Sequence, residues 1–447
     1  MLIFNLHISH LEICTLVQPR HINTLSLHLA LLSRIVFPGQ NPNMTHLSER
    51  IKRLSESQTI AMARRSRELI AQGIDIISLS LGEPDFKTPD VVKQAAKDAI
   101  DQDFSYYTHV SGYLELREAI AKKIERDNGL KYTAEQIVVS TGAKQSIVNV
   151  VLSLVNPGDE VIVPMPYWVS YVEMIKLAEG VPVIINTSIE NNFKVTPEQI
   201  AEAMTPKTRL LMFSSPCNPT GTVYSKEELR GIAEVIAKQP ECYIMADEIY
   251  EHINFIGPKD SPGSGHQSMA QFDFIYDRVA TINGVSKGFA MTGWRGGILA
   301  APLWLAKACD KMQGQFTSAT SSITQKAMHA AMLMDPTTTY ELRDAFKRRR
   351  DLMLAAMKEI PGMKLNVPEG AFYLFPDVTA FFGKRFGETV INNATDLSLY
   401  LLDLAHVAIV PGAAFGDDNY IRISYATADE KLVEAARRMK EALAKLS

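Results

Sequence analysis

The chain has 447 residues, of which 46% are hydrophobic and 21% charged, and its formal net charge is −4. This composition is typical of a globular protein with a large buried core, and the mixed charges exclude a basic face that binds nucleic acid. The four cysteines lie far apart without a CxxC pair, which excludes a disulfide framework. No apolar run reaches the roughly 18 residues that cross a bilayer, and we expect a cytoplasmic protein with free thiols.

The first 43 residues differ from the rest of the chain. They contain one acidic residue, Glu12, and four of the ten histidines, and a Pro/Gly-rich stretch at 38–43 breaks the chain before Met44. Basic residues interrupt any apolar region that a signal peptide needs. We therefore interpret residues 1–43 as an N-terminal extension that is disordered or not native, with Met44 as the working start.

From residue 44 onward, short apolar runs alternate with helical periodicity. A helix is expected over 91–100, entered through Thr88-Pro89-Asp90, where the threonine hydroxyl caps the helix and proline takes its first position. A second helix is expected over 114–127, because leucine and isoleucine recur on one face, with Gly129 near its end.

The middle of the chain predicts an α/β fold. Six short runs are apolar on both faces and separated by helical segments: 137–139, 160–163, 210–213, 243–246, 279–282 and 298–300. This pattern predicts a three-layer protein with a mostly parallel central sheet covered by helices. Because such sheets bind ligands at the carboxyl ends of their strands, we expect the polar residues after these strands to form one site.

The last third of the chain predicts a second, smaller α/β domain. Long charged helices are expected at 340–357 and 428–446, around a short strand at 371–374. We expect a large domain over 89–320 and a small C-terminal domain over 321–447. A Gly/Pro/Ser-rich loop at 258–266 interrupts the large domain.

The segment after the strand at 279–282 has two interpretations. Gly284-Val285-Ser286-Lys287-Gly288 matches the GxSxG nucleophile elbow of serine hydrolases, but so short a pattern often occurs by chance and explains none of the other polar clusters. The second interpretation begins with Lys287. A lysine in an electropositive pocket loses its proton well below its usual pKa of about 10.4 and attacks an aldehyde, while Ser286 and Arg295 can bind a phosphate.

Six motifs resemble one family. Asn218-Pro219-Thr220-Gly221, Asp247-Glu248-Ile249-Tyr250, and Ser286-Lys287 with Arg295 are similar to motifs of the fold-type I aminotransferases, which depend on pyridoxal 5′-phosphate (PLP). Three more motifs, 81–86, 166–168 and 422–427, make the resemblance closest to bacterial aspartate aminotransferases of class I, subgroup Iβ. The motifs occur in the family's order from about residue 45 to the end. The resemblance also implies that residues 44–88 belong to the small domain.

The resemblance implies how the cofactor is held. Lys287 would bind PLP as a Schiff base, Asp247 would face the pyridine nitrogen, and Tyr250 would hydrogen-bond the phenolic oxygen; these three are the expected catalytic residues. The phosphate would lie at the start of a helix. The expected cofactor-binding residues are Tyr107, which would reach a neighbouring subunit's phosphate in a homodimer, Gly142, Ala143, Lys144, Trp168, Asn218, Asp247, Tyr250, Ser286, Lys287 and Arg295.

The resemblance also implies the substrates. Arg422 would bind the α-carboxylate through its two-pronged guanidinium, and Lys144 the distal carboxylate of an acidic substrate. The expected substrate-binding residues are Thr59, Gly82, Lys144, Trp168, Asn218, Phe372 and Arg422. At 316–318 the sequence departs from the family, where a partner-subunit serine is usual. We expect a ping-pong transfer from aspartate to 2-oxoglutarate, with Lys287 as general base.

Other functions remain as alternatives. Prephenate or aromatic amino acids are the first alternative substrates. A racemase, decarboxylase or lyase on the same fold would keep Lys287 and Asp247, but Arg422 and Lys144 together favour transamination of an acidic substrate. A PLP-sensing transcription factor would need an N-terminal DNA-binding module. A nicotinamide dehydrogenase is disfavoured because no GxGxxG follows the first strands, and without an HExxH motif we expect no metal.

Overall fold

The computed structural model describes residues 46–56, 58–257 and 265–447. The extension expected at 1–43 and most of the loop expected at 258–266 lie outside the described residues. The described residues fall into two units, one that ends at Lys52 and one that spans 53–447. In the first unit, the structure describes a short helix, α2 (Glu49–Lys52). The central sheet, the hydrophobic cores and the candidate site all belong to the second unit.

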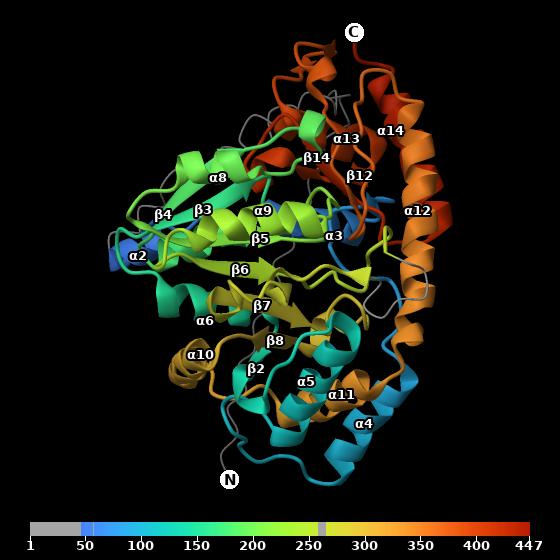
Figure 1. Ribbon diagram of the computed structural model, residues 1–447. Helices are drawn as coiled ribbons and strands as arrows, with labels where there is room; N and C mark the ends of the chain where they lie inside the picture. Colours follow the sequence, from blue (N-terminus) through green and yellow to red (C-terminus); the bar gives the residue numbers. More distant parts are fainter. Residues whose placement is uncertain (1–45, 57, 258–264) are drawn as a thin grey trace, which may run out of the picture. The chain divides into compact units, whose positions relative to one another are not determined.

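A seven-stranded sheet forms the centre of the second unit (Figure 1). Its strand order is β2-β8-β7-β6-β5-β3-β4. All its neighbouring pairs are parallel except the two pairs of β8, with β2 and β7, so the expectation of a mostly parallel sheet is confirmed. The strands are β2 (Ile137–Thr141), β3 (Glu160–Met165), β4 (Val181–Asn186), β5 (Thr208–Ser214), β6 (Tyr243–Asp247), β7 (Val279–Gly284) and β8 (Gly296–Ala300).

Helices cover both faces of this sheet. Because successive side chains of a strand point to opposite faces, each face has its own hydrophobic core. Ile137 and Val139 pack into one core, and Val138 between them packs into the other. The first core includes side chains of α4 (Asp90–Asp101), α5 (Leu114–Asn128), α8 (Pro197–Ala203), α9 (Lys226–Ala237) and α11 (Ser322–Leu333). The second includes side chains of α6 (Ala143–Leu154), α7 (Ser170–Leu177) and α10 (Leu303–Phe316).

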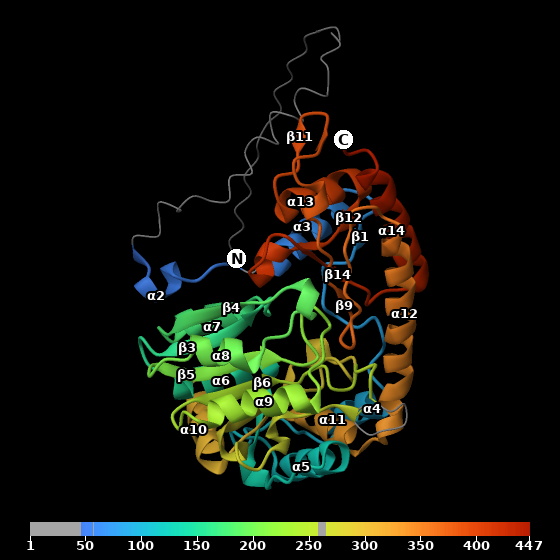
Figure 2. The same cartoon turned by 45° about the horizontal axis from the view of Figure 1, so that its top comes forward.

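A third core is formed mostly by residues of the C-terminal part of the chain, which is drawn in orange and red in Figure 2. It joins residues of α12 (Tyr340–Lys358), α13 (Ala394–Ala405) and α14 (Asp429–Leu443) to a small sheet in the order β13-β14-β9. The strands of this sheet are β9 (Tyr373–Leu374), β13 (Val410–Pro411) and β14 (Ile421–Ser424). A separate antiparallel pair consists of β10 (Arg385–Phe386) and β11 (Thr389–Val390).

The N-terminal segment contributes to the same part of the molecule. Strand β1 (Ile77–Ser78) pairs in parallel with β12 (Val407–Ala408), and helix α3 (Gln58–Ala71) contacts β12 and β13. Helix α11, by contrast, packs against α4 and α5. The domain boundaries at residues 88 and 320 stay a prediction.

The start of helix α4 differs from the expectation. The helix begins at Asp90, Pro89 occupies the N-cap, and no side chain caps it. The Thr88 hydroxyl instead donates to the Ala290 carbonyl (2.9 Å) and accepts from Trp294 Nε1 (3.2 Å). The prediction of a Thr88 cap is therefore wrong, because this hydroxyl is engaged by the segment that follows Lys287. The predicted end of α5 is confirmed, since Gly129 ends it with a left-handed φ of 69°.

Among the described residues, no helix combines the length and the apolar character that crossing a membrane requires.

Candidate active site

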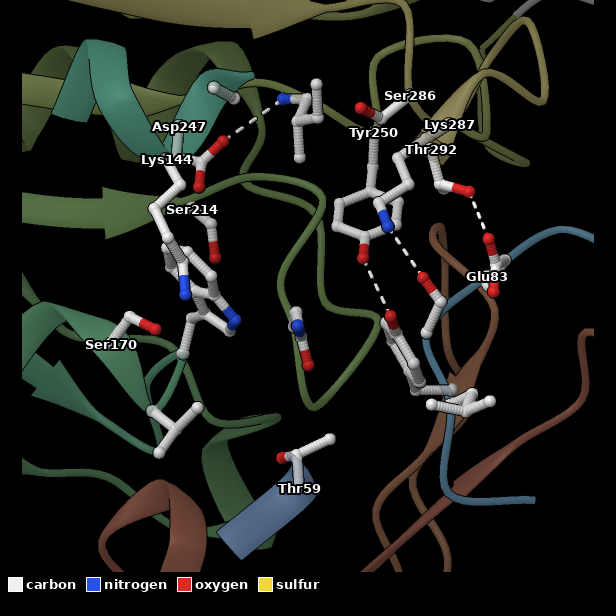
Figure 3. A pocket seen from close by; sticks show the side chains of 18 of the residues that line it. Thr59, Glu83, Lys144, Ser170, Ser214, Asp247, Tyr250, Ser286, Lys287 and Thr292 are labelled. Carbon is white, nitrogen blue, oxygen red and sulfur yellow. Dashed lines mark hydrogen bonds between the residues drawn. The ribbon is translucent and has the colours of Figure 1, made fainter. Parts of the chain in front are cut away.

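A cavity of about 360 Å³ lies beyond the carboxyl ends of the parallel strands (Figure 3). Residues that follow β2, β3, β5, β6 and β7 line it, as expected for a sheet of this kind. The structure brings twelve of the sequence-predicted site residues together in its wall: Thr59, Gly82, Ala143, Lys144, Trp168, Asn218, Asp247, Tyr250, Ser286, Lys287, Arg295 and Arg422.

Three predicted residues do not line this cavity. Gly142 is the N-cap of α6 and lies behind the wall, against Arg295. Phe372 is fully buried, with its ring centroid 5.9 Å from Lys287 Nζ. Tyr107 is 99% exposed.

Lys287 follows β7 and has its amine inside the cavity. Its Nζ donates a hydrogen bond of 2.6 Å to the Gly82 carbonyl and lies 5.8 Å from the centre of the Tyr250 ring. Desolvation lowers the pKa of Lys287 to about 8, against the opposing effect of the Glu83 charge. About one tenth of this amine is therefore neutral at pH 7, compared with well under one thousandth for an ordinary lysine, and able to act as a nucleophile or base.

Asp247 ends strand β6 as a buried carboxyl group. Tyr171 Oη donates to its Oδ2 (2.8 Å), and the Ile249 backbone N–H donates to its Oδ1 (3.3 Å). Burial raises the pKa of Asp247 to about 6. A carboxylate held in so apolar a place is costly unless a positive charge comes to face it, which suits the binding of a protonated ring nitrogen.

The beginning of helix α6 and Arg295 lie together at one corner of the cavity. Gly142 has a φ of 83°, and a Cβ on this residue would stand 2.3 Å from Arg295 Nη2. A Cβ on Gly297 would collide with the Gly142 backbone at 2.2 Å. Only glycine fits at these two positions. With Ser286 in the same wall, free helix N–H groups, a hydroxyl and a guanidinium converge as phosphate binding requires.

Arg422 is a buried cation on strand β14. It is 2% exposed, and it donates to Asn218 Oδ1 (3.0 Å) and to the Ser80 carbonyl (2.6 Å). Its Nε has no hydrogen-bond partner, and among the described residues the groups that influence its charge are the phenols of Tyr373 and Tyr250, with no carboxylate among them. Because a buried guanidinium without a counter-charge is unfavourable, this arrangement suits a site that receives a ligand's carboxylate.

Lys144 and Thr59 line another part of the cavity, away from Lys287 (Figure 3). The Lys144 ammonium lies 5.0 Å from the centre of the Trp168 ring, and desolvation lowers the pKa of Lys144, with a smaller contribution from Arg295. The Thr59 hydroxyl, on helix α3, is buried without a hydrogen-bond partner. These groups offer a second place for a negatively charged or hydrogen-bonding end of a ligand.

Five polar residues of the wall were not singled out from the sequence: Glu83, Ser170, Ser214, Thr292 and Tyr373. Glu83 accepts a hydrogen bond from the Thr292 hydroxyl, and both residues line the cavity. Tyr373 also lines it, whereas the residue expected here from the sequence is its neighbour Phe372. Adjacent strand residues point to opposite sides, so the alternation within 371–374 was the available signal.

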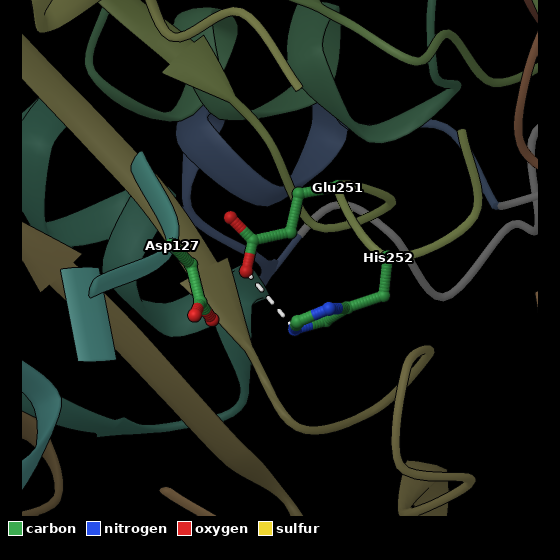
Figure 4. A group of neighbouring side chains, drawn as sticks. All are labelled: Asp127, Glu251 and His252. Atoms are coloured by element: carbon green, nitrogen blue, oxygen red, sulfur yellow. Dashed lines mark ion pairs between the residues drawn. The ribbon is translucent and has the colours of Figure 1, made fainter. Parts of the chain in front are cut away.

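A second group of charged side chains is buried outside this cavity (Figure 4). Asp127, Glu251 and His252 are buried close enough together to share one ion. Lys123 already supplies a positive charge, since its Nζ contacts Glu251 and lies 3.4 Å from Asp127. We interpret this group as an internal ion cluster. It supports the site because the His252 ring packs so closely on Gly288 that a Cβ there would stand 2.5 Å from it.

The fold is that of a class of transaminating enzymes. The chain matches the family "Aminotransferase class I and II" over residues 74–439, and it belongs to that family. The family predicted from the sequence is thereby confirmed.

Individual relatives are similar over most of their length. The chain is 45% identical to the bifunctional aspartate aminotransferase and glutamate/aspartate-prephenate aminotransferase of Petunia hybrida, covering 89% of this chain and 82% of the relative. It is also 45% identical to the aspartate/prephenate aminotransferase of Cereibacter sphaeroides, covering 90% and 100%. Among solved structures, the aspartate aminotransferase of Rhizobium meliloti superposes with a TM-score of 0.85 at 40% identity, covering 92% of this chain and 100% of the other. The aspartate aminotransferase of Thermus thermophilus with maleate superposes with a TM-score of 0.82 at 38% identity, covering 89% of this chain and 100% of the other.

Proposed function

We propose that this aminotransferase moves the amino group of aspartate to 2-oxoglutarate by a ping-pong mechanism, with PLP as its cofactor. The observation that carries the proposal is Arg422, a buried cation without a counter-charge in the same cavity as Lys287 and Asp247. The printed names of the relatives, which specify aspartate or aspartate and prephenate, support the choice of substrate. Prephenate stays the alternative.

The donor and acceptor groups of the cavity fit PLP. The start of α6, Ser286 and Arg295 would hold its phosphate, and Asp247 would hold its ring nitrogen. When bound, PLP supplies an aldehyde that reacts with amines and a ring that accepts electrons from the substrate's α-carbon. Tyr250 and Asn218 would donate hydrogen bonds to the phenolic oxygen, and Trp168 would cover one face of the ring.

Lys287 performs the proton transfer in this proposal. With a pKa of about 8, its amine would take the proton from the substrate's α-carbon and would return a proton to the carbon that had been the cofactor's aldehyde carbon. Asp247 keeps a negative charge opposite the ring nitrogen while this happens. Arg422 orients the α-carboxylate through two parallel hydrogen bonds.

The acidic side chain of the substrate would lie against Lys144 and Thr59. An amino acid with a second carboxylate is matched by a second cation, and Lys144 faces the same cavity as Arg422. We also propose a homodimer in which Tyr107 serves the partner's site, because so exposed an aromatic side chain is typical of an interface residue. A cytoplasmic location stays a prediction from the sequence.

The first test uses Lys287→Ala. The unmodified protein loaded with PLP should show an absorption band in visible light, and adding aspartate should bleach that band. Loss of the base should lower kcat by at least ~10²- to 10⁴-fold, while PLP still binds without a covalent bond. Full activity of Lys287→Ala in a coupled assay with aspartate and 2-oxoglutarate would refute the central role of this lysine.

The second test uses Lys144→Met, which keeps the apolar stem and removes the charge. The kcat/KM for aspartate should fall ~10- to 100-fold, because a charge-assisted hydrogen bond of ~1.5–3 kcal/mol is lost. The kcat/KM for phenylalanine should change only a few-fold. Since Lys144 also lies near the expected phosphate site, the PLP affinity of the variant serves as the control. If the unmodified enzyme converts phenylalanine faster than aspartate, the assignment of Lys144 is wrong.

A further inference from the structure

Tyr373 connects two parts of the candidate site. It lies on β9, is 1% exposed and lines the cavity. Its hydroxyl oxygen lies 2.7 Å from the Tyr250 hydroxyl oxygen. The guanidinium carbon of Arg422 lies 4.5 Å from the centre of its ring, within the range of a cation–π interaction. One side chain therefore contacts both Tyr250 and Arg422.

The Tyr373 hydroxyl has little freedom to move. A Cβ on Gly82 would stand 2.2 Å from this oxygen, so the Gly82 backbone encloses it closely. The carbonyl of the same glycine accepts the hydrogen bond from Lys287. The hydroxyl of Tyr373, the backbone of Gly82 and the amine of Lys287 are thus held in one arrangement.

The direction of the Tyr250–Tyr373 hydrogen bond depends on what Tyr250 contacts. Burial raises the pKa of both phenols, so both carry their protons at neutral pH. When Tyr250 donates its only proton to an acceptor in the cavity, its lone pair is left to accept the proton of Tyr373. A hydroxyl that accepts one hydrogen bond becomes a stronger donor of another.

We propose that Tyr373 is a positioning residue with two separable actions. Its hydroxyl strengthens Tyr250 as a donor toward the cofactor's phenolic oxygen, and its ring holds the guanidinium of Arg422 in place for the substrate's carboxylate. This inference rests on the proposed function, since it requires the cofactor and a carboxylate substrate in this cavity.

The hydroxyl is tested with Tyr373→Phe in the PLP-loaded enzyme. The readout is the pH midpoint of the visible absorption band, without substrate. A hydrogen bond to the phenolic oxygen favours the deprotonated chromophore, so weakening the donor should raise the midpoint by ~0.5–1 pH unit. The other charged groups near the two phenols are Lys287, Asp247 and Arg422, and all three are unchanged in this variant.

A double-mutant cycle shows whether Tyr373 acts through Tyr250. Tyr250→Phe should raise the midpoint more than Tyr373→Phe does, and adding Tyr373→Phe to it should raise the midpoint no further. An equal additional rise in the Tyr250→Phe background, or no rise from Tyr373→Phe alone, would overturn the proposed action of the hydroxyl. If the unmodified protein with PLP shows no visible band, the proposed function fails rather than this inference.

The ring is tested by comparing Tyr373→Phe with Tyr373→Leu, using maleate as a probe with two carboxylates. Tyr373→Phe keeps the aromatic face and should keep the maleate dissociation constant within about twofold. Tyr373→Leu removes that face and should weaken maleate binding ~3- to 30-fold. Equal affinities of the two variants would overturn the proposed action on Arg422. If Tyr373→Phe weakens maleate binding as much as Tyr373→Leu does, the effect comes from the hydroxyl and not from the ring.

Discussion

The buried carboxyl group of Asp247 shows a conflict between stability and function at a single residue. Without a ligand, its hydrogen bonds come from Tyr171 and from the Ile249 backbone, and neither brings a positive charge. The raised pKa measures how unfavourable the ionised form is in this place. Such a group is typical of a functional site, where stability is lower than the fold alone would allow.

The isosteric exchange Asp247→Asn should therefore stabilise the cofactor-free protein. The pKa of Asp247 is about 6 in the folded state and about 3.9 in an unfolded chain, so the folded state holds more protons between these values. Stability falls as pH rises through this window, and the penalty is complete above pH ~6. The variant should match the unmodified protein near pH 4 and exceed it by ~1–3 kcal/mol at pH 7.5. Urea unfolding at both pH values measures this, with the exposed Asp277→Asn as the matched control.

Asp247→Asn should at the same time lose most of its transaminase activity, because a neutral amide cannot hold a protonated ring nitrogen. The stability of Asp247→Asn minus that of the unmodified protein should be larger at pH 7.5 than at pH 4. A smaller difference at pH 7.5 would contradict the proposed cost of the ionised group.

At the scale of elements, an arginine of helix α12 joins three segments next to the site. Arg349 is 7% exposed and donates two hydrogen bonds to Asp85 (2.7 and 2.9 Å). Its Nε donates to Asp429 at the start of α14 (3.0 Å). Asp85 lies three residues after Gly82, whose carbonyl accepts from Lys287. The arginine thereby anchors the segment 82–85 on α12 and α14.

Arg349→Met should destabilise the protein by ~1–3 kcal/mol. Breaking a fully buried ion pair would cost more, but both aspartates here are about one third exposed. Arg349→Lys should not restore the loss, since one ammonium cannot make the two parallel bonds to Asp85. Chemical denaturation measures both effects. Arg348→Met is the matched control, since that neighbour also pairs with Asp429 but is exposed, and it should cost less than ~1 kcal/mol. If Arg348→Met lowers the stability as much as Arg349→Met does, the hydrogen bonds to Asp85 contribute little to stability.

At the scale of the whole molecule, the sequence predicted what is locally encoded. Buried parallel strands appear as short apolar runs, and six of the seven central strands were found in this way. Strand β4 was missed because it lies at the sheet edge, contains Pro182 and is largely exposed. The reversed direction of β8 was also not predicted, because its residues resemble those of a parallel strand.

The site shows the same division between local and long-range information. Motif residues after the strands were found because they carry unusual chemistry in a recognisable order. Thr88 was misassigned and Tyr373 overlooked because their partners lie about 200 and 123 residues away in the sequence. No local pattern reports such contacts, which only the packing of distant segments creates.

The proposed homodimer makes a prediction that one chain alone cannot satisfy. If Tyr107 serves the partner's site, a subunit with Tyr107→Ala still carries an intact Lys287, and a subunit with Lys287→Ala still carries an intact Tyr107. Each variant by itself should be poorly active, and a mixed dimer should contain one complete site of its two.

Unfolding and refolding an equal mixture should therefore restore about one quarter of the unmodified activity, because about half of the dimers are mixed and each has one working site. The mixture is compared with each variant refolded alone, at the same total concentration and with saturating PLP. Activity no higher than the mean of the two separate variants would show that Tyr107 acts within its own subunit or not at all. Restored activity would show that Tyr107, although its side chain is exposed in one chain, acts in the partner's site.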